Sequence, residues 1–233
     1  MRMTLTAAAL TVAGAFAAST ASAATFIYEN TGGTFGNGGS FSNVTSTYDA
    51  ASEQLTWLVD NGQRGGDIMD GAWLVLSDGP NPKRADVNEL AIFYLDFTTN
   101  RMAAYAYNGL NNSNSWLTPG VFLGDYSSGV VNSGTTRGFS IDASAINAAT
   151  VPNSGSGWQG TGFGSQIGIW FHPVFGLNAG YNADGSLNQW DFAAQTWLDL
   201  NAVNTVSVDE PALLGLMGLG LLVMSGFARR RSV

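Results

Sequence analysis

Hydrophobic and polar residues alternate with a period of two through most of the chain between residues 24 and 205. Leu55, Trp57 and Val59, for example, fall on one face of an extended segment. Turn-forming sequences rich in Gly, Asn, Asp and Ser separate such segments. The pattern predicts strands at 25–28, 40–48, 54–59, 72–76, 90–97, 102–107, 121–123, 139–141, 167–171 and 196–200.

Three connections between these strands carry local signals. Asp49-Ala50-Ala51-Ser52 predicts a turn, and Thr98-Thr99-Asn100-Arg101 predicts a hairpin. Only 142–149 has helical character, because Asp142 can cap a turn or two there. Longer loops are expected at 32–39 and 153–164.

Short strands without intervening crossover helices predict an all-β fold, an antiparallel β-sandwich or a jelly-roll-like ectodomain. The thirty glycines suit tight turns with positive φ. Residues 24–205 are long enough for one domain with a substantial core.

The chain opens with a single basic residue, which an uncharged segment follows. Arg2 precedes the apolar or small residues 4–18, and Ala21-Ser22-Ala23 then matches the small-x-small pattern that signal peptidase cuts. We expect residues 1–23 to be a signal peptide with a helical core, cleaved so that the mature chain begins at Ala24. The alternative is a permanent N-terminal anchor.

The last residues, 206–233, fall into three parts: Asp209-Glu210-Pro211, an uncharged apolar run at 212–228, and Arg229-Arg230-Arg231. The run has seventeen residues, which as a helix measure roughly 25 Å, the short end of what spans a bilayer. Arginines can snorkel to the headgroups and hold their end on the cytoplasmic side. A single C-terminal transmembrane helix is therefore expected, with the rest of the chain on the other face of the membrane.

This tail resembles the PEP-CTERM sorting signal of Gram-negative bacteria, which combines a Pro-Glu-Pro motif, a membrane helix and a terminal arginine cluster. Glu210 and Pro211 match the second and third motif positions, and Asp209 stands where the first proline normally lies. The resemblance implies an exosortase, a membrane-embedded cysteine transpeptidase, as a partner, and an association with exopolysaccharide and biofilm. An ordinary, unprocessed anchor is the alternative.

Charge and cysteine content exclude several function classes. All seventeen acidic residues but only five of the nine basic ones lie between Ala24 and Pro211, which gives this part a formal charge of −12. Such a surface repels nucleic acid and anionic lipid, although it would attract cations such as calcium. Cysteine is absent, so disulfides, thiolate metal sites and a cysteine nucleophile are excluded.

Catalytic signals are weak. His172 is the only histidine, and no Gly-x-Ser-x-Gly elbow accompanies it, so we interpret it as a structural side chain bonded to a nearby loop. A glycosidase would need paired carboxylates. The candidates are Glu53 and Glu89, with Asp67, Asp70, Asp78 and Asp86 nearby in sequence.

The residues that could form a metal site or a sugar-binding site each have a second interpretation. Asp60, Asp67 and Asp70 could wrap a calcium ion, but their spacing departs from the EF-hand template, and solvated loop acids are the simpler interpretation. We expect no cofactor. Trp116 and Trp158 lie in polar loops, where they could stack on sugar rings or instead fold back over the ends of the sandwich.

The blocks 70–83, 104–109 and 168–173 look like the centre of an exported-protein family, with no activity attached to them. We therefore expect a non-enzymatic envelope or extracellular-matrix protein that is exported, anchored at least transiently, and then sorted to the surface. Signal peptidase, an exosortase and exopolysaccharide are its expected partners. The alternative is a lectin-like or carbohydrate-active β-sandwich that acts on surface polysaccharide.

Overall fold

The computed structural model describes residues 25–34, 40–61, 68–78, 89–106, 120–151, 160–161, 166–196, 198–203 and 205–206. All of them belong to one compact unit, Ala23–Val208. The strands are β1 (Thr25–Thr34), β2 (Ser40–Asp49), β3 (Gln54–Asn61), β4 (Gly71–Asp78), β5 (Glu89–Asp96), β6 (Arg101–Ala106), β7 (Phe122–Asp125), β8 (Val130–Ser133), β9 (Thr136–Asp142), β10 (Gln166–Phe175), β11 (Asn178–Tyr181), β12 (Leu187–Asp191), β13 (Ala194–Gln195), β14 (Leu198–Val203) and β15 (Thr205–Val206). The helices are the 3-10 turn η2 (Ser127–Gly129) and α1 (Ser144–Ala148).

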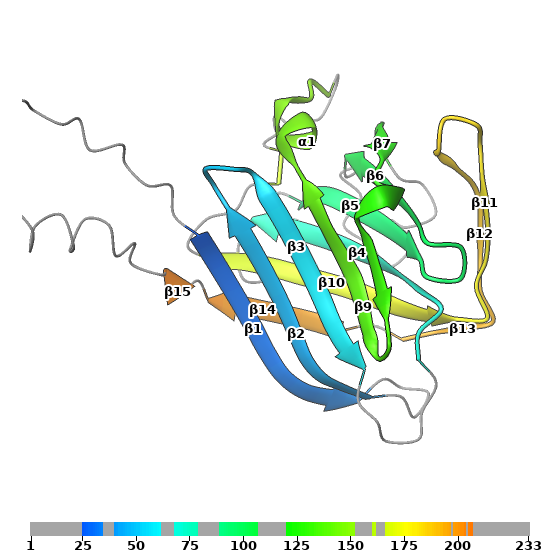
Figure 1. Ribbon diagram of the computed structural model, residues 1–233, viewed down its shortest axis with the longest axis horizontal. Helices are drawn as coiled ribbons and strands as arrows, with labels where there is room; N and C mark the ends of the chain where they lie inside the picture. The colour runs from blue at the N-terminus through cyan, green and yellow to red at the C-terminus, as the bar shows by residue number, and fades with distance from the viewer. Residues whose placement is uncertain are drawn as a thin grey trace, which may run out of the picture. The chain divides into compact units, whose positions relative to one another are not determined.

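The strands form two large antiparallel sheets and one small one. The front sheet has six strands in the order β15-β1-β2-β3-β9-β8. The back sheet has seven strands, β13-β10-β4-β5-β6-β7 with β14 also beside β10, and it lies behind the front sheet in Figure 1. The all-β, antiparallel prediction is therefore confirmed. Within the sheets β1–β2–β3 and β4–β5–β6–β7 are meanders, whereas a jelly roll is built from Greek keys.

Aromatic side chains join the two sheets across a shared core. Trp57 of β3 meets Phe171 of β10 edge-on, with ring centroids 5.2 Å apart. Phe93 of β5 and Phe139 of β9 are also separated by 5.2 Å. Such ring pairs stabilise a fold by about 0.5–1.5 kcal/mol beyond their buried area, so this chain needs no disulfide to hold its sheets together.

Strand β3 shows the expected alternation. Leu55, Trp57 and Val59 are fully buried, while Thr56 and Leu58 between them are partly exposed. The front sheet thus has one apolar and one solvated face, as antiparallel sheets commonly do.

The back sheet is buried on both faces. Along β4, Ala72 and Leu74 belong to the shared core, whereas Trp73 and Val75 belong to a second hydrophobic cluster on the outer face. The β11–β12 hairpin packs against that cluster, and it appears at the right in Figure 1. This double burial explains why 90–97 reads as a nearly continuous apolar run.

Two contacts attach the hairpin. Trp190 of β12 packs edge-on against Tyr94 of β5, with centroids 5.2 Å apart. The backbone N–H of Leu187 donates to the Tyr105 hydroxyl of β6 at 2.7 Å. The sequence pattern missed this hairpin because its two strands are short, contain several polar residues and are only partly buried.

Several boundaries differ from the predictions. Strand β10 continues through Pro173 to Phe175. The strand beside it changes from β14 to β13 at this point, so the backbone N–H that proline lacks is not needed for pairing. Strand β1 continues to Thr34, so the expected loop at 32–39 is wrong at its start; residues 35–39 lie outside the described part. Strand β8, and strand β13 beside β10, were not predicted.

The local signals for turns were accurate. Asp49 Oδ1 accepts hydrogen bonds from the backbone N–H groups of Ala51 (2.8 Å) and Ser52 (3.2 Å). The β5–β6 hairpin pairs Asp96 with Arg101, as expected. Helix α1 is shorter than 142–149, and its N-cap is Ala143 rather than the expected Asp142; Asp142 Oδ1 instead accepts from the N–H of Ser144, the first residue of the helix, at 2.9 Å.

Candidate functional site

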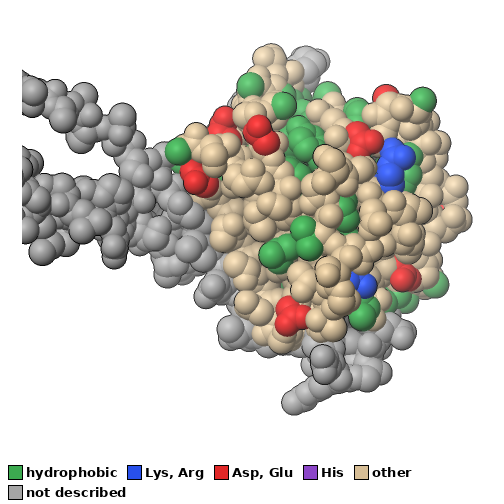
Figure 2. Space-filling view, in the orientation of Figure 1, with side chains coloured by type: hydrophobic (Ala, Val, Ile, Leu, Met, Phe, Trp, Pro, Cys, Tyr) green, Lys and Arg blue, Asp and Glu red, His purple; other side chains and the backbone are tan. Residues whose placement is uncertain are grey.

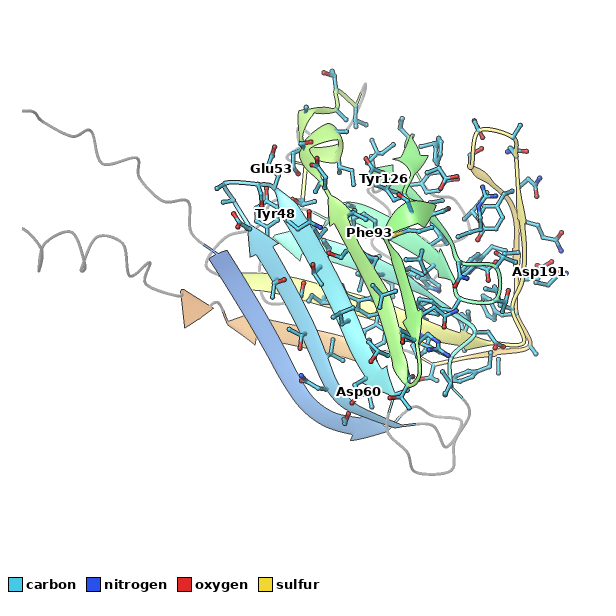
Figure 3. All side chains as sticks on the ribbon, in the orientation of Figure 1. Tyr48, Glu53, Asp60, Phe93, Tyr126 and Asp191 are labelled. Carbon is cyan, nitrogen blue, oxygen red and sulfur yellow. The ribbon has the colours of Figure 1, made fainter. Side chains whose placement is uncertain are left out.

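A cavity of about 180 Å³ lies where the β5–β6 turn meets the β8–β9 hairpin. We call it the end pocket. It is at the end of the sandwich where Asp60 is labelled in Figure 3, since Thr135 of the β8–β9 turn donates to Asp60 Oδ1 at 2.7 Å. Its lining residues are Ile68, Met69, Asp70, Phe97, Thr98, Asn132 and Arg137.

Backbone hydrogen bonds fix one wall of the end pocket. The N–H of Asp70 donates to Val174 of β10 at 3.0 Å, and the carbonyl of Asp70 accepts from the N–H of Phe97 at 2.8 Å. The Asp70 carboxylate also accepts, through Oδ2, from the N–H of Gly176 at 2.6 Å. Its position is therefore set by three backbone contacts, while Oδ1 makes no hydrogen bond within the described residues.

Asn132 connects the front sheet to the β5–β6 turn. Its amide donates to the carbonyl of Phe97 at 2.6 Å and to Asn100 Oδ1 at 2.7 Å. Both donors of the amide are thereby used. Asn132 Oδ1 accepts no hydrogen bond from the part of the chain that the structure describes.

Arg137 supplies the positive charge. Its Nη1 donates to the carbonyls of Gly134 and Thr136, both at 2.9 Å, and its Cζ lies 5.9 Å from the centroid of the Phe97 ring. Burial lowers the pKa of the Arg137 guanidinium from its usual value, and the Asp70 carboxylate acts in the opposite direction. The group still stays protonated. Within the described residues Nη2 makes no hydrogen bond.

The end pocket thus combines hydrogen-bond donors, acceptors and apolar atoms on a fixed framework. Met69 is 1% exposed and Phe97 5%, so both are held in place by the core. Sequence reasoning singled out Asp70 but missed Asn132 and Arg137. Arg137 is one of only five basic residues between Ala24 and Pro211, but that property alone does not mark it as a site residue.

The three aspartates considered as possible calcium ligands are not gathered in the described part of the chain. Asp60 accepts from Ser42 Oγ and Thr135 Oγ1, both at 2.7 Å, and these bonds lower the pKa of its carboxyl group. Asp70 is in the end pocket, and Asp67 lies outside the described residues. No group of three or more acidic or histidine side chains in the described ranges is placed to hold a metal ion.

Glu53 belongs to a separate polar cluster at the opposite end, where it and Tyr48 are labelled in Figure 3. Asn147 is its centre: Nδ2 donates to Tyr48 Oη at 3.0 Å and to Glu53 Oε1 at 2.9 Å. Asn147 Oδ1 accepts from both the N–H and the hydroxyl of Thr161, at 2.8 Å each. Burial, followed by the Glu53 charge, raises the pKa of Tyr48.

The other candidate carboxylates are not brought to Glu53 by the described contacts. Glu89 is the first residue of β5 and Asp78 the last of β4, and Asp86 lies outside the described residues. The Asn147 cluster therefore ties α1 to the β2–β3 turn.

His172 lies inside β10 rather than at a strand end. It is 5% exposed, and its ring stacks on Trp73 at 3.9 Å with Trp170 at 5.2 Å. Trp73, Tyr105 and Trp170 come from the three sequence blocks 70–83, 104–109 and 168–173. Except for Asp70, the described residues of the three blocks lie on β4, β6 and β10 of the back sheet, with β5 between β4 and β6, and these three side chains belong to its outer hydrophobic cluster.

The residues of the expected cleavage and sorting signals, together with Trp116 and Trp158, lie outside the described residues. These are Ala21, Ala23, Ala24, Trp116, Trp158, Asp209, Glu210, Pro211, the run 212–228, Arg229, Arg230 and Arg231. Among the residues that are described, no helix has the length and apolar character needed to cross a membrane.

Comparison with known proteins gives no relative: no family, no curated protein and no solved structure matches this chain.

Proposed function

We propose that the chain is an exported, non-enzymatic protein of the cell envelope or extracellular matrix, sorted by an exosortase-type system. The observation that carries the proposal is the pairing of the two ends of one sequence. A cleavable signal ends at Ala23, and the acidic-proline step at 209–211 stands directly before an apolar run and three arginines. The ectodomain between them is proposed to be a β-sandwich, preceded by the signal helix and followed by one transmembrane helix.

The chemistry of the ectodomain supports a structural role. Three of the described carboxylates hold local structure: Asp49 and Asp142 accept from nearby backbone N–H groups, and Glu53 accepts from Asn147. Groups used in this way hold loops in place. The glycosidase alternative would need two of them to face a sugar instead.

Among the side chains that the structure describes, the outer face of the front sheet carries hydroxyl and amide groups. Thr56 and Ser140 hydroxyls lie 2.8 Å apart, and Gln54 donates to Ser140 at 3.0 Å. Figure 2 shows charged side chains on this face as isolated groups rather than as a patch. A surface of hydroxyl and amide groups is suited to a hydrated polysaccharide matrix.

Changing Glu210 and Pro211 together to alanine tests the sorting proposal. The variant should stay in the inner membrane with its full C-terminus, because the transpeptidase would lose its recognition step. The matched control changes Val206 and Ser207, just outside the motif, to alanine and should leave sorting intact. Fractionation and intact mass give the readout; a double variant that still reaches the surface at normal mass would make the tail a plain anchor.

A further inference from the structure

We propose that the end pocket binds a single neutral sugar ring. This inference concerns the ectodomain alone and does not depend on how the tail is processed. It begins with size: a volume of about 180 Å³ is below the roughly 300–1,000 Å³ of pockets for drug-sized ligands. The occupant is therefore one small ring rather than an extended molecule.

The polar groups select a ligand that both donates and accepts hydrogen bonds. Arg137 offers Nη2 as a donor, and Asp70 and Asn132 each offer an oxygen that no described residue uses. A hydroxyl is both donor and acceptor, so adjacent hydroxyls of a sugar can satisfy all three side chains.

The charges favour a neutral ligand. Arg137 and Asp70 both line the end pocket and carry opposite charges that interact, so the pocket has no net charge. The exported part as a whole is strongly acidic, which disfavours a carboxylated sugar at long range. Hydrogen bonds to charged groups are also stronger than those between neutral groups, and they suit uncharged hydroxyls.

The remaining wall supplies apolar contact. Met69 and Phe97 are held rigidly by the core, whereas Ile68 is 38% exposed at the rim. The C–H groups of a sugar ring can lie against Ile68, which is the accessible apolar side chain of this wall, while the hydroxyls turn to the polar wall. Because the polar groups are positioned by backbone hydrogen bonds, little ordering is needed on binding.

Saturation-transfer NMR with the full-length chain in detergent micelles tests the proposal. The probes are glucose, galactose, mannose and glucuronate. At least one neutral sugar should bind, and more tightly than glucuronate. Two variants should weaken that binding by about tenfold or more: Ile68→Trp, which fills the rim, and Asp70→Asn, which keeps the acceptor for Gly176 but loses the charge.

Matched controls separate a local effect from unfolding. Val121 is the other exposed large hydrophobic side chain among the described residues, at 44%, and it does not line the pocket, so Val121→Trp should bind like the parent. Methyl shifts measured on the unaltered protein provide a second test, because sugar should move Ile68 but not Val121.

Three results would overturn the proposal: no neutral sugar binds, glucuronate binds best, or a folded Ile68→Trp variant binds as tightly as the parent. None of them bears on sorting, which the Glu210 and Pro211 variant tests separately.

Discussion

Replacing Gly138 by alanine should separate β3 from β9, because the backbone leaves no room for a side chain there. Gly138 pairs with Leu58 and has φ 154°. A Cβ atom at this position would lie 2.0 Å from the carbonyl oxygen of Trp57 and 2.9 Å from Cα of Leu58. Both are backbone atoms of the neighbouring strand, so they cannot move aside as a flexible side chain would.

Two costs contribute to the expected loss of stability. A residue other than glycine in this region of φ costs about 1–3 kcal/mol. Crowding an additional carbon into a closed interior costs about 1–3 kcal/mol more. Their sum, about 2–6 kcal/mol, is a large part of the about 5–15 kcal/mol that stabilises a typical domain.

Gly134→Ala is the matched control. Gly134 has a positive φ of 55°, but a Cβ atom there would meet nothing within 4 Å. Only the backbone cost applies, about 1–2 kcal/mol. Thermal unfolding followed by far-UV circular dichroism should place the Gly138→Ala midpoint about 2–12 °C below that of Gly134→Ala, since the additional crowding cost is about 1–3 kcal/mol and 1 kcal/mol corresponds to about 2–4 °C at this size. Equal losses in the two variants, within about 0.5 kcal/mol, would refute the close approach of β3 and β9.

Three further outcomes are expected. N-terminal sequencing of exported protein should begin at Ala24, and a retained Met1 would show that the signal is not cleaved. Asn147→Ala should destabilise the domain by about 2–4 kcal/mol in urea unfolding, because the Tyr48, Glu53 and Thr161 groups lose their shared partner; Asn43→Ala, which loses a single side-chain bond to Thr45, should cost less than half as much. Hydrogen bonds lower the folded-state pKa of several aspartates below the usual 3.8, so the stability that these groups contribute is present above that value and is lost as the pH falls through the lower folded-state pKa values. The midpoint of unfolding should therefore be flat from neutral to about pH 5 and should fall below about pH 4. This fall should be less steep in Asp60→Asn. The aspartates concerned are Asp49, Asp60, Asp142 and Asp184.

Periodicity and turn chemistry were sufficient to predict the strands that bury one face. In β3 the sequence alternates because only one side meets the core, and the Asp49 turn has the side chain that such a turn requires. The β11–β12 hairpin gave no such signal. Its role is to cover Trp73 and Tyr94 on the outer face of the back sheet, and that face exists only once β4, β5 and β10 are paired.

The end pocket could not be predicted for a related reason. Asn132 and Arg137 are cross-strand partners in the β8–β9 hairpin, but Asp70 is distant from them in sequence and meets them only because the two sheets pack together at this end. Nothing in the local sequence around Arg137 distinguishes it from a solvated strand residue. Glycine contacts such as that of Gly138 are equally dependent on pairing between distant strands.

The pairing of distant strands also determines when the domain can close. Strand β1 pairs on one side with β15, which comes much later in the sequence and places Val206 opposite Phe26. Strand β4 likewise pairs on one side with the much later strand β10. A chain made from its N-terminus therefore carries β4, β5 and β6 for some time with an uncovered, tryptophan-bearing face. Folds with such high contact order form slowly and expose aggregation-prone surface. On the proposed route of export, the domain should consequently remain dependent on a chaperone until almost its whole length has been delivered, so that folding follows transport rather than accompanying it.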